Sequence, residues 1–209
     1  MDILAPLAGT FIYISYPWNS QTFIVTHNLI LQVFSTWMCG SLSYAVYNKG
    51  FHIESEYYMS DPWIKFLVFC FYLSKYYEYL DTFILYGKGK QPIFLQKYHH
   101  IGAAFTWHLA WAYNVDGAVV ASLLNSGVHS IMYSYYLCTA LKINMNMIKQ
   151  YITYLQMVQF IIGMYTTYRY YLIETFQNKV ITVICGLYTL GNFILFAKFI
   201  KDTYMKKIE

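Results

Sequence analysis

Six stretches of mainly apolar residues approach or exceed the roughly 20 residues that a helix needs to cross the hydrocarbon core of a bilayer. Their approximate bounds are 22–47, 62–86, 98–114, 117–138, 147–172 and 180–200. Because lipid offers no hydrogen-bond partners to backbone groups, each stretch predicts a membrane-spanning helix. Residues 3–18 are also apolar, but Pro6 and Pro17 restrict them to a short or incomplete seventh segment. We therefore expect an all-α, polytopic membrane helical bundle that forms a single domain over residues 1–209.

The composition agrees with the bilayer as the solvent of this chain. Hydrophobic residues make up 58% and charged residues only 11%, against about 25% charged residues in soluble domains. The 14 Lys and Arg residues stand singly between apolar runs, so nucleic-acid binding is not expected despite the net charge of +4. The 4 cysteines lie far apart in apolar segments, where free, buried thiols are expected. The N-terminal residues lack the basic segment and cleavage site of a signal peptide, so no processing is expected.

The loops between the apolar stretches predict an orientation, because cytoplasmic loops collect Lys and Arg. Lysines fill alternate loops and the C-terminal end: Lys88, Lys90 and Lys97, then Lys142 and Lys149, then Lys198, Lys201, Lys206 and Lys207. The intervening loops have no positive bias, so we expect a cytoplasmic C-terminus. Lys206 and Lys207 resemble the dilysine signal that retrieves proteins to the endoplasmic reticulum membrane. A solvated basic tail is the alternative interpretation.

Charged residues interrupt the second apolar stretch. Lys75, Glu78, Asp81 and Thr82 are spaced so that they share one helical face, where Lys75 can pair with Glu78 one turn away. A central charge in such a helix costs at least about 2.5 to 3.5 kcal/mol, so something must compensate it. An ion pair that holds two helices together is one explanation, but a polar cavity is favoured.

Further polar residues enter the next three stretches. They are Gln96, His99 and His100 at the entrance to the third, Asn125, His129, Tyr133 and Tyr136 in the fourth, and Thr153, Gln156 and Gln159 in the fifth. Adjacent histidines point about 100° apart on a helix, so His99 and His100 face one point only with help from other helices. Interhelical hydrogen bonding is the alternative for the other two sets. Together the residues suit acyl chemistry, because imidazole is a nucleophile or base near neutral pH that carboxylates, amides and phenols can orient.

These residues resemble the motifs of the membrane elongases of very-long-chain and polyunsaturated fatty acids. The family's K-x-x-E-x-x-D-T motif is matched by Lys75, Glu78, Asp81 and Thr82, and its H-x-x-H-H box by His99 and His100, with Gln96 at the first histidine. The H-x-x-M-Y-x-Y-Y box is matched by His129, Met132, Tyr133, Tyr135 and Tyr136, and the T-x-x-Q-x-x-Q box by Thr153, Gln156 and Gln159. The boxes follow the family order, and the stretches around the first two look most like algal polyunsaturated-fatty-acid elongases. Two departures are that the family has seven spans and a longer chain, and that Gln96 removes one imidazole.

The resemblance implies a 3-ketoacyl-CoA synthase that condenses an acyl-CoA with malonyl-CoA and needs no cofactor or metal. It implies that His99 attacks the thioester, that His100 and His129 position the intermediate, and that Glu78, Asp81 and Asn125 orient these rings while Lys75 balances charge. Expected substrate-binding residues are Gln96, Thr82, Tyr133, Tyr136, Thr153 and Gln156, with Lys88, Lys90 and Lys97 near the CoA phosphates. Expected partners are the bilayer and other enzymes of the elongation cycle, and a homodimer is left open.

Three other interpretations remain. A di-iron desaturase also carries histidine boxes, but only 6 histidines are present, and His27, His52 and His108 lie outside any paired box. A transporter or receptor would explain the polar stripes but not the histidine pair. An inactive homologue is compatible with the short N-terminal part and with Gln96.

Overall fold

The computed structural model describes residues 18–205, so most of the predicted short segment at 3–18 and the tail with Lys206 and Lys207 lie outside the described residues. The elements are α2 (Gln21–Lys49), α3 (Pro62–Tyr77), α4 (Tyr79–Gly87), α5 (Phe94–Ala112), α6 (Gly117–Ala140), α7 (Asn146–Ile173), α8 (Phe176–Ile200) and a π-helical turn η1 (Lys201–Met205). No strand occurs among the described residues. The all-α prediction is confirmed, and each predicted stretch coincides with one helix, except that α3 and α4 share the second.

Local sequence signals mark the ends of several helices. The Asp61 side chain accepts hydrogen bonds from the backbone N–H groups of Trp63 and Ile64, and Pro62 occupies the first position of α3. At the other end of the preceding loop, Gly50 ends α2 with a φ of 90°, which a residue with a Cβ adopts only with strain. Loop 50–61 is thus bounded by a residue that ends α2 and a residue that begins α3, and both are recognisable in the sequence.

The second stretch was predicted as one helix over 62–86, and this was wrong in one respect: the helix breaks at Glu78. The N–H of Asp81 donates to the carbonyl of Glu78, three residues earlier, at 3.1 Å, so the backbone tightens locally. No glycine or proline signals this break. The break lies between the charged residues Lys75 and Asp81.

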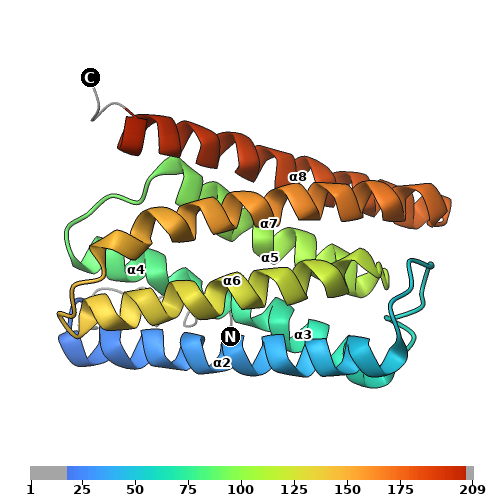
Figure 1. Cartoon of the computed structure of the whole chain (residues 1–209), viewed down its shortest axis with the longest axis horizontal. Coiled ribbons are helices and arrows are strands. Elements are labelled where there is room, and N and C mark those ends of the chain that lie inside the picture. Colours follow the sequence, from blue (N-terminus) through green and yellow to red (C-terminus); the bar gives the residue numbers. More distant parts are fainter. Residues whose placement is uncertain (1–17, 206–209) are drawn as a thin grey trace, which may run out of the picture.

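The helices run back and forth along one axis (Figure 1), with α2 beside α6, and α7 beside α8. Loops 88–93 and 141–145 lie at one end of the bundle, together with η1, while loops 50–61 and 113–116 lie at the other. The lysine-bearing loops of the predicted cytoplasmic side therefore gather at one end. This arrangement follows from short connections between long helices.

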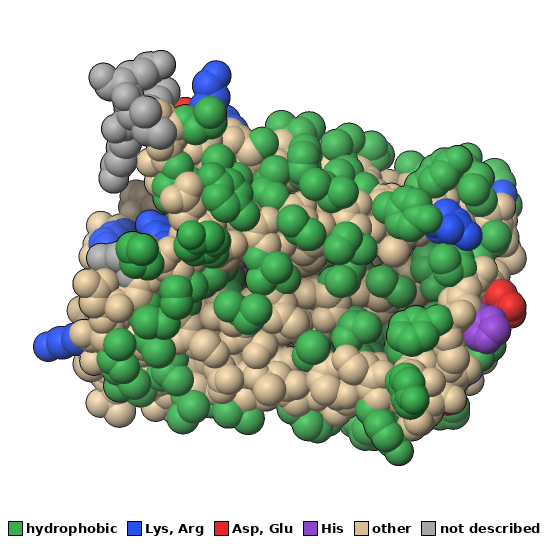
Figure 2. Space-filling model, viewed as in Figure 1, with side chains coloured by type: hydrophobic (Ala, Val, Ile, Leu, Met, Phe, Trp, Pro, Cys, Tyr) green, Lys and Arg blue, Asp and Glu red, His purple; other side chains and the backbone are tan. Residues whose placement is uncertain are grey.

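The outer surface of the bundle is apolar. Figure 2 shows hydrophobic side chains over the flanks, with Lys, Arg and acidic side chains towards the two ends. Among the outward-facing residues, Val33 is 55% exposed, Phe105 56% and Leu187 63%. Such a surface fits lipid contact better than water. By length and composition, two helices in the described part, Gln21–Lys49 and Phe176–Met205, could cross a membrane, and the count of six spans stays a prediction.

Candidate active site

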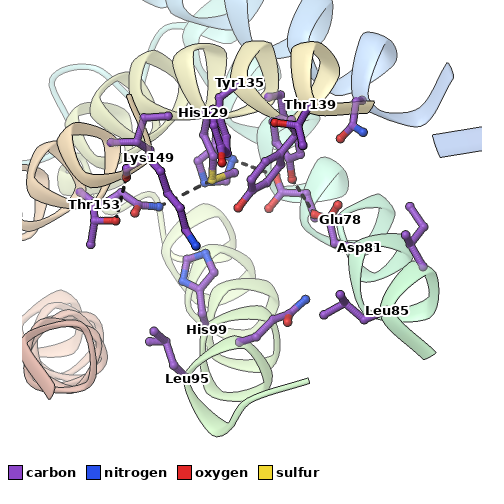
Figure 3. Close-up of a pocket in the computed structure, with 18 of the residues that line it drawn as sticks. Glu78, Asp81, Leu85, Leu95, His99, His129, Tyr135, Thr139, Lys149 and Thr153 are labelled. Carbon is purple, nitrogen blue, oxygen red and sulfur yellow. Dashed lines mark hydrogen bonds and ion pairs between the residues drawn. The ribbon is translucent and has the colours of Figure 1, made fainter. Parts of the chain in front are cut away.

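A cavity of about 550 Å³ lies between α2, α4, α5, α6, α7 and α8. Its polar lining combines residues from every predicted motif: Glu78, Asp81, Gln96, His99, His100, Asn125, His129, Tyr133, Tyr136, Thr153, Gln156 and Gln159. Figure 3 shows side chains from several helices directed into this one space. The predicted cavity is therefore present, but Lys75 and Thr82 do not line it, and apolar side chains such as Ile84 and Phe160 complete its surface.

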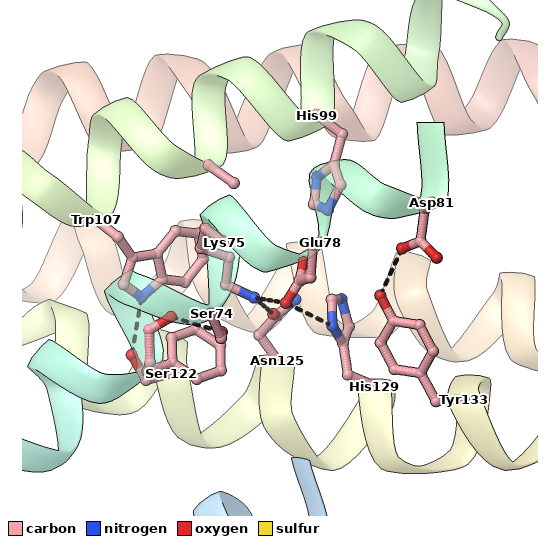
Figure 4. Close-up of polar contacts among 12 residues, drawn as sticks. Ser74, Lys75, Glu78, Asp81, His99, Trp107, Ser122, Asn125, His129 and Tyr133 are labelled. Atoms are coloured by element: carbon pink, nitrogen blue, oxygen red, sulfur yellow. Dashed lines mark hydrogen bonds and ion pairs between the residues drawn. The ribbon is translucent and has the colours of Figure 1, made fainter. Parts of the chain in front are cut away.

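Lys75 lies beneath the cavity floor and is only 1% exposed. Its ammonium donates to Glu78 Oε1 at 2.8 Å and to Asn125 Oδ1 at 3.0 Å, as Figure 4 shows. The same nitrogen lies 3.9 Å from the centre of the Phe71 ring. A buried charge is tolerated only when it is paired and hydrogen-bonded, and these contacts supply that environment. The predicted contact between Lys75 and Glu78 is confirmed, and Glu78 is thereby held at the cavity wall.

Three imidazoles from two helices converge at the cavity. The ring centre of His99, on α5, lies 5.7 Å from that of His100 and 6.4 Å from that of His129, which belongs to α6. His129 Nδ1 lies 3.6 Å from Glu78 Oε1, too far for a hydrogen bond but within ion-pair reach if the ring is protonated. The third imidazole thus comes from α6, because two adjacent residues of α5 point in different directions and cannot surround one point by themselves.

Asp81 is held by two donors that approach from different helices. Its Oδ2 accepts the hydroxyl proton of Tyr133 at 2.7 Å, and its Oδ1 lies 2.9 Å from Nε2 of His27, on α2. His27 is 1% exposed and stacks against Tyr77. His27 belongs to no motif, so the sequence does not predict it as a site residue. The only available signal was a lone imidazole in an apolar stretch, which needs a polar partner when buried.

Four of the predicted binding residues make weaker contacts around the cavity. Gln96 lines it and its amide lies 3.5 Å from Thr82 Oγ1, although Thr82 is not part of the lining. Gln156 approaches the sulfur of Met132 at 3.6 Å. Thr153 donates to its own helix at the carbonyl of Lys149, at 3.1 Å. Gln96, Thr153 and Gln156 therefore border the cavity but are held less tightly than Glu78.

The lysines at the cavity differ from the predicted set. Lys88 lines it, as expected, but Lys90 and Lys97 are exposed outside it. Lys142 and Lys149, which come from the loop after α6 and from the first turn of α7, complete the lining instead. In Figure 3, Lys149 extends into the cavity in the direction of His99. The sequence had assigned these two lysines to membrane orientation only.

His99 is also contacted by Tyr188, a residue that belongs to none of the motifs. The hydroxyl of Tyr188, on α8, lies 3.0 Å from His99 Nδ1 and 3.0 Å from the His99 carbonyl oxygen.

Within residues 18–205, no group of three or more His, Cys, Asp or Glu side chains is arranged to hold a metal ion.

Comparison with known proteins agrees with the motifs. Residues 8–209 match the family described as ELO: GNS1/SUR4 family. Fatty acid elongase sre1 of Dictyostelium discoideum is 35% identical over 195 residues, which cover 87% of this chain and 72% of that protein. Very long chain fatty acid elongase 4 of Trypanosoma cruzi is 36% identical over 210 residues, covering 91% of this chain and 72% of that protein.

A vertebrate relative is more distant. Very long chain fatty acid elongase 7 of Rattus norvegicus is 29% identical over 157 residues, covering 70% of this chain and 56% of that protein. No solved structure matches the chain significantly. The narrower resemblance to algal polyunsaturated-fatty-acid elongases is not confirmed by these relatives. Since the family match spans residues 8–209 and the first two of these relatives are 35% and 36% identical over 72% of their length, the chain belongs to the ELO (GNS1/SUR4) family of fatty acid elongases.

Proposed function

We propose that the chain condenses a long-chain acyl-CoA with malonyl-CoA to give 3-ketoacyl-CoA, carbon dioxide and CoA. The observation that carries this proposal is the convergence of His99, His100 and His129 on one cavity with three lysines in its lining. Imidazole is a nucleophile for thioesters near neutral pH, and ammonium groups bind phosphates such as those of CoA. The apolar chain would occupy the space between the helices.

In the proposed first step, His99 Nε2 attacks the thioester carbonyl carbon, and the carbon–sulfur bond breaks with its electron pair on the CoA thiolate. The product is an acyl-imidazole on His99, which is a cation as long as Nδ1 keeps its proton. In the second step, malonyl-CoA loses carbon dioxide, and the electron pair left on the malonyl carbon attacks the acyl carbon. The carbon–nitrogen bond then breaks, and its electron pair returns to Nε2. His100 and His129 are close enough to the His99 ring to polarise the acyl carbonyl. The thiolate takes one proton from water, so the reaction needs no cofactor.

In this proposal, the charged residues Lys75, Glu78 and Asp81 position the reacting groups. Lys75 keeps Glu78 ionised and in place, and Glu78 stands 3.6 Å from His129, where it would stabilise a positive charge on that ring. Asp81 orients Tyr133 and His27 in the same wall. A buried carboxylate with fixed donors orients neighbouring groups better than a solvated one. These residues therefore position the reacting groups.

The proposal also includes a location. Six membrane spans, a cytoplasmic C-terminus and residence in the endoplasmic reticulum would put the lysine-rich end of the bundle on the side where CoA substrates occur. The gathering of Lys88, Lys142 and Lys149 at that end supports this orientation. Other enzymes of the elongation cycle are proposed partners because they would consume a 3-ketoacyl product.

The direct test supplies membranes that contain the protein with labelled malonyl-CoA and a panel of saturated and polyunsaturated acyl-CoAs. We expect products two carbons longer, and we expect His99→Ala to abolish them while membrane insertion stays intact. His52→Ala is the matched control, because this histidine lies in loop 50–61 at the opposite end of the bundle. A fully active His99→Ala protein would contradict the nucleophile, and stoichiometric iron in the purified protein would favour a desaturase.

A second test locates the phosphate site. Lys142→Ala/Lys149→Ala should raise KM for acyl-CoA about 5- to 10-fold, since hydrogen bonds between charged groups contribute about 1.5 to 3 kcal/mol and solvent screens part of this. Lys65→Ala, at the other end of the bundle, is the control. A larger rise in KM for Lys90→Ala/Lys97→Ala would show that these two lysines, as predicted from the sequence, bind the CoA phosphates.

A further inference from the structure

Tyr188 presents its hydroxyl group to His99 from the last helix of the bundle. The Oη atom lies 3.0 Å from His99 Nδ1 and 3.0 Å from the carbonyl oxygen of the same residue. The two rings are nearly parallel, with 16° between their planes and 6.4 Å between their centres. A single hydroxyl thus contacts both the side chain and the backbone of the imidazole that lines the cavity.

The position of the Tyr188 ring is fixed by two contacts between α5 and α8. A Cβ atom added to Gly102 would overlap the Tyr188 ring, and one added to Gly191 would overlap the phenol of Tyr98. Each tyrosine therefore lies over a glycine of the other helix, and the two rings stack on each other at 5.8 Å. Close packing of this kind leaves few alternative rotamers. The hydroxyl is consequently held at His99 by shape before any hydrogen bond is considered.

The two contacts at Oη admit one arrangement of protons in which both are hydrogen bonds. A carbonyl oxygen only accepts, so the single hydroxyl proton of Tyr188 must point to the His99 carbonyl. The hydroxyl oxygen then accepts from Nδ1, which must carry a proton. Among the described residues, no hydrogen bond occupies Nε2 of His99, a residue that lines the cavity.

We infer that Tyr188 is a positioning residue that holds His99 as its Nδ1–H tautomer, with the lone pair of Nε2 free to attack the acyl thioester. This inference rests on the proposed function of His99. A histidine in the opposite tautomer would present an N–H bond to the thioester and could not attack through Nε2. The tautomer thus decides whether the ring is a nucleophile towards the cavity.

The same hydrogen bond would gain strength during the reaction. When Nε2 bonds to the acyl carbon, the CoA thiolate leaves with the carbon–sulfur electron pair and the ring, still protonated at Nδ1, becomes a cation. A hydrogen bond from a charged donor is stronger than one from a neutral donor, so Tyr188 stabilises the acylated ring more than the free ring. When the malonyl-derived carbanion takes the acyl group, the electron pair of the carbon–nitrogen bond returns to Nε2 and the ring is neutral again.

The test compares Tyr188→Phe with Tyr98→Phe. Both changes keep the ring that covers a glycine, and only the first removes the hydroxyl at His99. The measured step is CoA release from acyl-CoA in the absence of malonyl-CoA. We expect a fall of about 10- to 100-fold for Tyr188→Phe, by analogy with the loss of an outer partner that orients a metal-bound imidazole. Tyr98→Phe removes only a long hydrogen bond to the Tyr188 carbonyl, at 3.4 Å, so we expect a change within about 2-fold. Equal rates in both variants and the unmodified protein would overturn the inference.

A second measurement reads the tautomer itself. Nitrogen NMR of protein with 15N-labelled histidine rings distinguishes protonated from unprotonated ring nitrogens, and the His99 signals are those lost in His99→Ala. We expect the proton on Nδ1 in the unmodified protein and a redistribution in Tyr188→Phe; a proton on Nε2 in the unmodified protein would overturn the inference even if Tyr188→Phe failed to fold. CoA release that survives His99→Ala would instead refute the proposed function, so the two failures are distinguishable.

Discussion

Replacement of Asp116 by alanine should weaken the attachment of loop 50–61 to the bundle at the end opposite the lysines. Asp116 precedes α6 and is 0% exposed. Its Oδ2 accepts the backbone N–H of Tyr58 at 2.9 Å, and its Oδ1 accepts the N–H of Met59 at 2.8 Å. The loop has few other attachments of this kind, among them the hydrogen bond from Ser55 to Glu174. Asp116→Ala would leave two buried N–H groups without acceptors.

The magnitude follows from the two bonds and from the burial that opposes them. A hydrogen bond to a charged group contributes about 1.5 to 3 kcal/mol, so two contribute about 3 to 6 kcal/mol. Against this, burial raises the pKa of the Asp116 carboxyl above its ordinary value, although the backbone N–H groups of loop 50–61 lower it. Desolvation therefore offsets part of the gain, and we expect Asp116→Ala to reduce the free energy of unfolding by about 2 to 4 kcal/mol.

The assay is equilibrium unfolding in detergent micelles, combined with hydrogen exchange of the Tyr58 and Met59 amides. Glu54→Ala is the matched control, because this carboxylate belongs to the same loop but its side chain is 64% exposed. Its effect should stay within about 0.5 kcal/mol. Equal midpoints for the two variants, with both amides as protected as before, would refute the reasoning.

The raised pKa of Asp116 also predicts a pH dependence. A group whose pKa is higher in the folded than in the unfolded protein contributes stability that is complete below the unfolded pKa and is lost as the pH rises through the folded pKa. The pKa of an Asp side chain in the unfolded protein is about 3.9, so the loss of stability begins as the pH rises above this value. Asp116→Ala should therefore cost more stability at about pH 5 than at about pH 8. The opposite trend in midpoints would show that the hydrogen bonds from the loop, and not burial, dominate.

Two further changes test the interior of the site. Lys75→Met should destabilise the protein by about 3 to 5 kcal/mol, because it leaves the buried Glu78 carboxylate without its cationic partner. The double variant Lys75→Met/Glu78→Gln should recover most of this loss in the same unfolding assay. A double variant no more stable than Lys75→Met would contradict the pairing. His27→Phe keeps the stacking on Tyr77 but removes the donor to Asp81, so we expect elongation to fall about 10-fold. The unfolding midpoint should fall less than in Lys75→Met, because Asp81 keeps the Tyr133 hydroxyl and its side chain is 19% exposed. Full activity of His27→Phe would mean that Tyr133 alone holds Asp81.

The sequence was sufficient to predict contacts that depend on helical geometry and on one polar face. The spacing of Lys75 and Glu78 predicted a contact within one turn, and the two groups are 2.8 Å apart. The stripe of Asn125, His129 and Tyr133 predicted a common direction, and all three line the cavity. Such predictions succeed because the period of a helix is a local property that tertiary structure does not change.

Features that depend on the order of helices in space could not be predicted. His27 is 54 residues from Asp81 and Tyr188 is 89 residues from His99, and neither belongs to a motif. Nothing in a helical period says which neighbouring helix will face such a residue. The break at Glu78 was missed for a different reason, because a single turn with an i, i+3 hydrogen bond needs no glycine or proline.

The two missed residues share a location, which indicates how the site is divided among the helices. His27 belongs to α2 and Tyr188 to α8, the helices at the two ends of the described chain, whereas every motif residue lies on α3 to α7. Each contacts a motif residue from outside the motif set, Asp81 in one case and His99 in the other. The motif helices thus supply the groups proposed to react, and the outer helices supply groups that orient them. Substitutions of His27 and Tyr188, neither of which lines the cavity, should therefore alter turnover without contact with the substrate, because an orienting partner acts through the residue that it holds.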